Sequence, residues 1–246
     1  DVRRYGHWMR DEAFKQIGHL YPKVTITPEI IKQRPDLEQY KGQELTVIAW
    51  LWARTVKSPN PAFSHVDVPL VRSFILSSKK GKEVYVQPIV EGDSYRFEVK
   101  VGKLPKDAIP GTVQRSGGRC LMSDTAMPFS YIRKEGKAKR MGERLMAIIA
   151  EGNRGRVYLS PKTEMVEIAK SVQPKFKSKV LLDGKCRVSL PGYGFDVYSD
   201  LFTSRQLMVL NTFSDLIPKL RDKVITDAKA AGMIDDEKGL DDNGNG

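Results

Sequence analysis

Residues 45–76 read LTVIAWLWARTVKSPNPAFSHVDVPLVRSFIL, and this stretch decides the fold that we expect. An apolar run rich in Val, Ile, Trp and Phe stands at each end, which favours two strands with buried faces. Between the runs, Ser58-Pro-Asn-Pro-Ala-Phe63 has the prolines of a tight turn. A second short turn, Arg119-Cys-Leu-Met-Ser-Asp124, follows about 60 residues later. We therefore expect strands that are joined by two similar turns.

The two turns have the spacing of a zinc ribbon, in which cysteines would occupy positions 58, 63, 120 and 123. Structural zinc is normally held by four Cys or His ligands on two such turns. Here the four positions are Ser58, Phe63, Cys120 and Ser123, so only one thiolate is available. Cys120 and His65 together would supply two ligands at most. We expect a degenerate ribbon without a metal site, in which Phe63 and the neighbouring strands fill the space.

The stretches 45–76 and 118–159 resemble the zinc-ribbon-containing adenine-specific DNA methyltransferases of bacteria and archaea. In that family a W-L-W-A-R-T-V strand leads into C-P-N-P-x-C and then P-L-V-R-S-F. Later, R-C-x-x-C precedes P-F-x-Y-I-R, found here as Pro128–Arg133, and an L-M-A-I-x-A-E-G-x-x-G-R-x-Y-L hairpin, found here as Leu145–Leu159. The resemblance extends over roughly residues 1–235 and covers the internal region of such an enzyme.

This resemblance implies a DNA-binding or target-recognition region whose partners are DNA and the flanking methyltransferase parts of the same protein. The intact enzyme would use S-adenosylmethionine to methylate the adenine N6 amino group. The cofactor-binding half and the catalytic [DNS]-P-P-[YFW] segment of the family are missing here. We therefore expect no catalytic residue, no cofactor in this chain and no activity of the chain alone. The alternative is a stand-alone nucleic-acid-binding or interaction module without enzymatic activity.

One short segment, Asn60-Pro-Ala-Phe63, resembles the N-P-P-F motif of amino-group methyltransferases with one departure. In that motif the Asn and a proline carbonyl accept hydrogen bonds from the target amine, and the aromatic ring stacks on the flipped base. No glycine-rich loop follows a strand to bind a methyl donor. The neighbouring residues place the segment in the first turn, so we expect it to be structural.

The charge of the chain favours a polyanionic partner. Its 41 Lys and Arg exceed its 30 Asp and Glu, which gives a net charge of +11. Between residues 130 and 190 there are 15 basic and 6 acidic residues. Such residues neutralise phosphates without reading bases; the alternative is a solvated surface. The candidate nucleic-acid-binding residues are Arg133, Lys134, Lys137, Lys139, Arg140, Arg144, Arg154 and Arg156.

We expect an α+β fold, with antiparallel hairpins on the degenerate zinc ribbon and a helix at each end. An N-terminal helix and linker would span residues 1–44 and a β-rich domain 45–200. A C-terminal helix would span 201–234 and an acidic disordered tail 235–246. Hairpins are predicted at 83–101 and 145–159. No run of 18 apolar residues exists, so we expect no membrane partner. Two cysteines and no visible signal peptide favour a reducing, cytoplasmic compartment, and the start at Asp1 suggests a fragment of a longer prokaryotic protein.

Four further expectations concern the second half of the chain. Residues 133–140 read as a basic, glycine-interrupted connector, and residues 186–190 as a strand that buries Cys186. Residues 192–195 read as a flexible aromatic loop. Thr203 and Gln206 form a capping box that begins the last helix, and Pro218 is expected to kink or divide that helix.

Overall fold

The computed structural model describes residues 1–105, 110–153 and 155–233 of the chain. It is a mixed α+β structure with antiparallel sheets and with a helix at each end of the sequence, which confirms the expected class. The acidic segment 235–246 and Arg154 lie outside the described residues.

The chain forms two compact units. A helical unit combines residues 1–20 and 172–177 with residues 202–233. A β-rich unit combines residues 21–171 and 178–201. The sequence places the first boundary later, at residue 44, and does not anticipate that both terminal helices belong to one unit.

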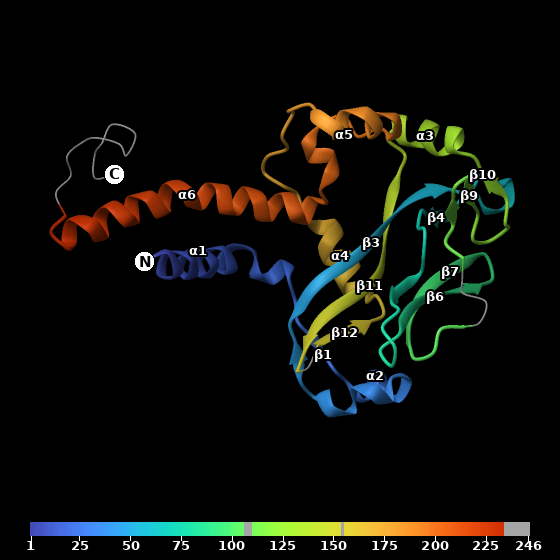
Figure 1. The fold of residues 1–246 in the computed structure, drawn as a ribbon, viewed down its shortest axis with the longest axis horizontal. Coiled ribbons are helices and arrows are strands. Elements are labelled where there is room, and N and C mark those ends of the chain that lie inside the picture. Colours follow the sequence, from blue (N-terminus) through green and yellow to red (C-terminus); the bar gives the residue numbers. More distant parts are fainter. Residues whose placement is uncertain (106–109, 154, 234–246) are drawn as a thin grey trace. The chain divides into compact units, whose positions relative to one another are not determined.

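The main sheet of the β-rich unit has four antiparallel strands in the order β12-β11-β3-β4. These are β12 (Gly155–Leu159), β11 (Gly142–Gly152), β3 (Val47–Lys57) and β4 (Asp67–Pro69). Figure 1 shows β3 and β11 running side by side as its two long central strands. Their register pairs Ile148 with Trp50, while Ile148 also faces Leu159 across the β11–β12 hairpin. The apolar run that opens residues 45–76 thus becomes a central strand.

A second sheet confirms the predicted hairpin and corrects one predicted strand. Its order is β5-β6-β7, with β5 (Ile75–Ser77), β6 (Val84–Glu91) and β7 (Ser94–Val101). In β7, Tyr95, Phe97 and Val99 are buried and alternate with more exposed residues, as a strand with one wet face requires. The expected single strand at 69–76 is divided. Its start pairs with β3 and its end with β6, because the chain turns from one sheet to the other around buried Phe74.

The remaining elements close the unit around these sheets. Two short sheets pair β1 (Val24–Thr25) with β2 (Glu44–Leu45), and β9 (Gly117–Arg119) with β8 (Val113–Gln114) and β10 (Ala126–Met127). The helical segments are α2 (Pro28–Gln33), η2 (Pro35–Tyr40), η3 (Pro61–Phe63), α3 (Phe129–Lys137), α4 (Thr163–Ser171), α5 (Gly184–Ser189), η4 (Pro191–Tyr193) and η5 (Tyr198–Leu201). Pro28 occupies the first turn of α2, where a proline is well tolerated.

Two of these helices correct the sequence-based expectations. The supposed connector at 133–140 is mostly α3, whose inner face buries Ile132, Glu135 and Gly136. The supposed strand at 186–190 is α5, which begins at Asp183, where the side chain accepts a hydrogen bond from the Gly184 N–H. Cys186 is accordingly half-buried on a helix and is not a core strand residue. The expected aromatic loop at 192–195 includes η4 and is held by hydrogen bonds to Leu190 and Pro191.

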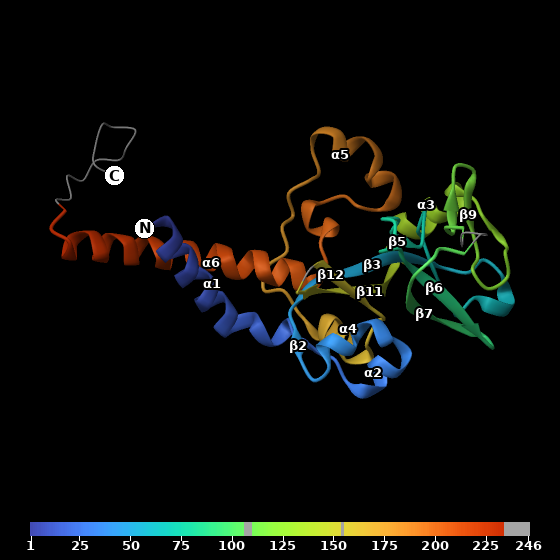
Figure 2. The same ribbon diagram turned by 60° about the horizontal axis from the view of Figure 1, so that its bottom comes forward.

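The helical unit pairs α1 (Val2–Ile17, continued by η1, Gly18–Leu20) with α6 (Ser204–Ala230). Both views show the two helices side by side (Figures 1 and 2). The predicted capping box at Thr203 and Gln206 is present. Pro218 neither divides nor ends α6, which continues for 12 residues beyond it. The apolar residues of α6 are only partly buried, since Leu207 and Leu216 are covered but Ile217 is 59% exposed. None of the described helices combines the length and apolar character that crossing a bilayer requires.

Candidate nucleic-acid interface

The structure divides the predicted basic residues into those with internal partners and those without. Arg140 belongs to the first group, because its Nε and Nη2 donate to the two carboxylate oxygens of Glu135 at 2.9 and 2.6 Å. Glu135 is buried on α3, and hydrogen bonding to Arg140 lowers the pKa of its carboxyl group. Arg140 therefore compensates a buried carboxylate.

Arg144 also has a structural contact. Its guanidinium carbon lies 3.9 Å from the centre of the Tyr95 ring, and Nη2 donates to the Tyr95 carbonyl oxygen. Burial raises the pKa of Tyr95 to about 12, although the nearby guanidinium acts to lower it. A cation stacked on a buried ring in this way joins β11 to β7. The guanidinium group of Arg144 is therefore already used in a structural contact.

Lys139 is held in the same way, by the segment that follows α5. Its Nζ lies 2.9 Å from Asp196 Oδ2 and 3.2 Å from Asp200 Oδ2, and it also donates to the Gly194 carbonyl oxygen. Hydrogen bonding to Asp196 raises the pKa of this amine, so Lys139 is charged at neutral pH. Two carboxylates already neutralise that charge.

The other predicted cations are more available. Arg133 lies with its guanidinium carbon 5.4 Å from the centre of the Tyr193 ring and is otherwise exposed. Lys134, Lys137 and Arg156 are exposed, and none of them has an ion pair within the described part of the chain. Arg154 lies outside the described residues. Of the predicted set, Lys134 and Lys137 on α3 and Arg156 on β12 are therefore the described cations that have no internal partner.

The two turns of the expected ribbon do meet. Ser58 Oγ lies 3.1 Å from Cys120 Sγ, and both residues are buried. Burial acts to raise the pKa of the Cys120 thiol, but hydrogen bonds from Ser123, Ser58 and the backbone of Met122 and Ser123 outweigh it and lower the pKa. Ser58, Cys120 and Ser123 thus lie together, while the relation of this site to a zinc ribbon stays a prediction.

The remaining ribbon residues point elsewhere. Phe63 is partly buried and packs against the core cluster around Phe74 and Phe97. His65 Nε2 lies 3.0 Å from the carbonyl oxygen of Asp93, in the β6–β7 turn. Within the part of the chain that the structure describes, no three His, Cys, Asp or Glu residues converge on a metal position.

Asn60 has a structural role in the first turn. Its Oδ1 accepts a hydrogen bond from the Ala62 N–H at 3.0 Å and caps η3, and its Nδ2 lies 3.5 Å from Thr125 Oγ1 beside the second turn. Its side-chain amide thus contacts both turns. This arrangement agrees with the prediction that Asn60-Pro-Ala-Phe63 is part of the first turn.

We expect the purified chain to contain no stoichiometric zinc and to keep its fold in the presence of a chelator. The reason is that three of the four ribbon positions hold no thiolate and that hydrogen bonds join the two turns directly. Elemental analysis and circular dichroism with and without EDTA measure both properties. About one zinc per chain, or unfolding in EDTA, would contradict this expectation.

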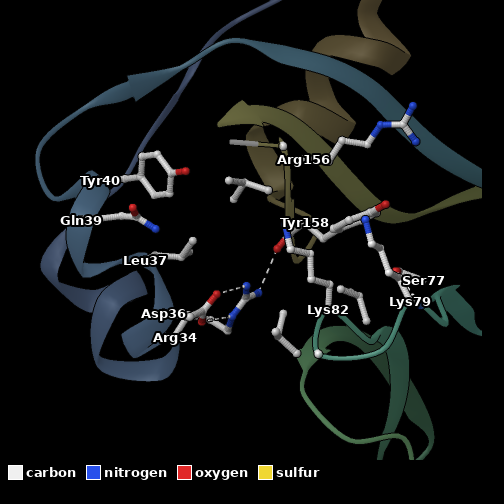
Figure 3. A pocket seen from close by; sticks show the side chains of 15 residues that line it. Arg34, Asp36, Leu37, Gln39, Tyr40, Ser77, Lys79, Lys82, Arg156 and Tyr158 are labelled. Carbon is white, nitrogen blue, oxygen red and sulfur yellow. Dashed lines mark hydrogen bonds and ion pairs between the residues drawn. The ribbon is translucent and has the colours of Figure 1, made fainter. Parts of the chain in front are cut away.

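A groove of about 790 Å³ brings together basic residues that the sequence analysis does not connect. Its walls come from η2, from the β5–β6 loop and from β12, as Figure 3 shows. Lys79 and Lys82 extend from the β5–β6 loop toward Tyr158, and Arg156 lies on the other side of Tyr158 and extends away from the two lysines. Lys79, Lys82 and Arg156 are exposed and have no ion pair among the described residues. We call these three residues the groove cations.

The wall opposite the β5–β6 loop is fixed by Arg34. Its Nε and Nη2 donate to the carboxylate of Asp36 at 2.7 and 2.8 Å, and its Nη1 donates to the Tyr158 carbonyl oxygen at 2.8 Å. Tyr40 supports the same wall, since its hydroxyl accepts a hydrogen bond from the Asn153 N–H at 3.1 Å. These bonds tie η2 to the β11–β12 hairpin. The groove is therefore held by defined contacts on this side.

The comparisons with known proteins identify no relative. No protein-family model matches the chain, no curated protein matches it, and no solved structure matches its fold. The functional argument therefore depends on the residues and on the geometry described above.

Proposed function

We propose that this chain is the internal DNA-binding and target-recognition region of an adenine-specific N6 DNA methyltransferase that uses S-adenosylmethionine. The sequence motifs that resemble this family occur in β3, the two turns and the β11–β12 hairpin, which form the centre of the β-rich unit. In this proposal the chain holds DNA while flanking parts of the protein bind the cofactor and transfer the methyl group.

The observation that supports DNA binding most directly is the set of groove cations. Two of them come from the β5–β6 loop and the third from β12, more than 70 residues later, yet they line one groove. Exposed cations from separate elements that line one groove and have no ion pair among the described residues create a positive potential that favours a polyanion. Lys134 and Lys137 on α3 add two further exposed charges. A phosphate backbone is the polyanion that best fits such a distribution.

A stand-alone nucleic-acid-binding module is the second candidate, because exposed cations can hold a phosphate backbone without any catalytic part. The two candidates differ in what the complete reading frame does. The two candidates can be distinguished by expressing the complete reading frame and measuring tritium transfer from S-adenosylmethionine to an adenine-containing duplex. Transfer supports the methyltransferase, whereas DNA binding without transfer supports the module.

We expect the chain to bind duplex DNA with a strong salt dependence and with little preference for sequence. If roughly four phosphates are neutralised, the logarithm of the affinity falls against the logarithm of the salt concentration with a slope of about −3.6. Changing Lys134 and Lys137 to Ala should make the slope less steep by about 1.8 and weaken all duplexes about equally, because phosphate contacts carry no sequence information. Fluorescence anisotropy over a series of salt concentrations measures this slope.

The control for charge is the double variant Lys170→Ala/Lys185→Ala, which removes two exposed lysines from α4 and α5. It should leave the slope within about half a unit of the original. The slope changes only when a residue that contacts a phosphate is removed. Equal changes in slope for both double variants would mean that Lys134 and Lys137 belong to a solvated surface without a specific role in DNA binding. Failure of the unmodified chain to bind any DNA would contradict the proposed function itself. Lys139, Arg140 and Arg144 are unsuitable for this test because their substitution also removes structural contacts.

A further inference from the structure

The groove differs from a flat phosphate-binding surface because apolar side chains lie between its charged walls. The apolar surface comes mainly from Val101, which is 42% exposed, and from half-buried Tyr158, while Leu37, Val84 and Val157 also line the groove but are almost completely buried. Figure 3 shows the Tyr158 side chain between Lys79 and Arg156. A polyanion that touched only the cations would leave this apolar surface wet. The arrangement therefore suits a ligand that has phosphates and exposed apolar rings together.

A single nucleic-acid strand has both features, whereas a double helix presents mainly its phosphates. In a duplex the bases are stacked and paired, so their faces cannot lie against Val101 or Tyr158. Proteins that hold single strands combine a positively charged groove with side chains on which bases rest. The volume of about 790 Å³ also falls within the range of pockets for small ligands, about 300–1,000 Å³. Such a volume can hold a few nucleotides of one strand.

We infer that the groove binds a short single-stranded segment of DNA, with its phosphates on the groove cations and its bases on the apolar surface around Tyr158. This inference rests on the proposed function, since it places an unpaired part of the DNA that the chain holds in this groove. Gln39 and the Tyr158 hydroxyl provide polar groups that can contact base edges, and Figure 3 shows both side chains at the groove. Duplex DNA would bind outside the groove, on Lys134, Lys137 and neighbouring surfaces.

The test compares one oligonucleotide sequence as a single DNA strand, as a duplex and as a single RNA strand, with the whole chain and anisotropy as the readout. The groove variant is Lys79→Ala/Lys82→Ala/Arg156→Ala. We expect it to weaken single-stranded DNA at least tenfold and to make its salt slope less steep by about two units, at about 0.7 per lost phosphate contact. Duplex affinity should change less than threefold.

The matched control is Lys170→Ala/Lys185→Ala/Arg187→Ala, which removes the same charge from exposed positions on α4 and α5 that do not line the groove. It should change single-strand affinity less than threefold. An equal loss of single-strand and duplex binding in the groove variant would overturn the inference, as would unchanged single-strand binding. RNA bound tenfold more tightly than DNA would also overturn it. Binding of neither form by the unmodified chain would instead refute the proposed function.

Discussion

Replacement of Gly194 by alanine is expected to lower the free energy of unfolding by about 3 kcal/mol, because two backbones meet at this residue. Gly194 has φ +81, a backbone conformation that residues other than glycine rarely adopt. A Cβ atom at this position would also lie 2.0 Å from the Gly136 carbonyl oxygen. In return, a Cβ on Gly136 would lie 2.3 Å from the Tyr193 carbonyl oxygen. Neither backbone can yield without separating α3 from η4.

That separation would also break side-chain contacts on both sides of the glycine pair. Lys139, just after α3, is bonded to Asp196 and Asp200 beyond η4. Arg54 on β3 donates to the Asp200 carbonyl oxygen at 3.3 Å, and its guanidinium carbon lies 5.3 Å from the centre of the Phe195 ring. The segment after α5 thus depends on the close approach of Gly136 and Gly194. We expect several contacts to weaken together.

Gly192 offers a control two residues away. A Cβ atom there would meet no atom within 4 Å, and its φ lies outside the left-handed region. Gly192→Ala should therefore change the free energy of unfolding by less than about 0.5 kcal/mol. Urea denaturation, followed by circular dichroism, measures the free energy of unfolding of the unmodified chain and of the two variants. A Gly194→Ala variant as stable as the Gly192→Ala variant would show that the two backbones are not held in contact.

This glycine contact also shows why residues 133–140 are not the connector that the sequence predicts and why part of 192–195 is helical. Basic residues around Gly136 have the composition of a loop, and so does the Gly-Tyr-Gly run. The helix α3 forms because Ile132 and Met127 join a shared core and because Gly136 leaves room for a second backbone. Contacts between segments almost 60 residues apart decide the structure of both segments, and such contacts cannot be predicted from local composition.

Local patterns predict other elements correctly. The alternation of Tyr95, Phe97 and Val99 identifies β7, and the Thr203–Gln206 pair marks the start of α6. Such features depend on residues within one strand or one helical turn. The groove is the opposite case, since the β5–β6 loop appears as an unrelated basic loop until the sheets bring it to Arg156. For the same reason, the sequence could not show that Arg140 and Arg144 have buried partners.

Substitution of Ile148 by alanine is the second change with a large expected effect. Ile148 is completely buried in the central strand β11, where it pairs in register with Trp50 on one side and Leu159 on the other. Removing three carbons from such a position leaves a cavity that the two neighbouring strands cannot close. We expect the free energy of unfolding to fall by about 3–4 kcal/mol, within the range of similar core substitutions. Urea denaturation gives this value directly.

Ile48 on the adjacent strand β3 is the matched control, since it is 52% exposed. The same substitution at Ile48 should cost well under about 1 kcal/mol, because little apolar surface is lost and no cavity forms. Ile148→Val should fall between the two, at about 0.5–1.5 kcal/mol. Since Leu159 lies one residue beyond Tyr158 on β12, loss of packing at Ile148 should also loosen the groove wall that Arg34 holds. Equal costs at Ile48 and Ile148 would contradict the register of β3 and β11 on which the β-rich unit depends.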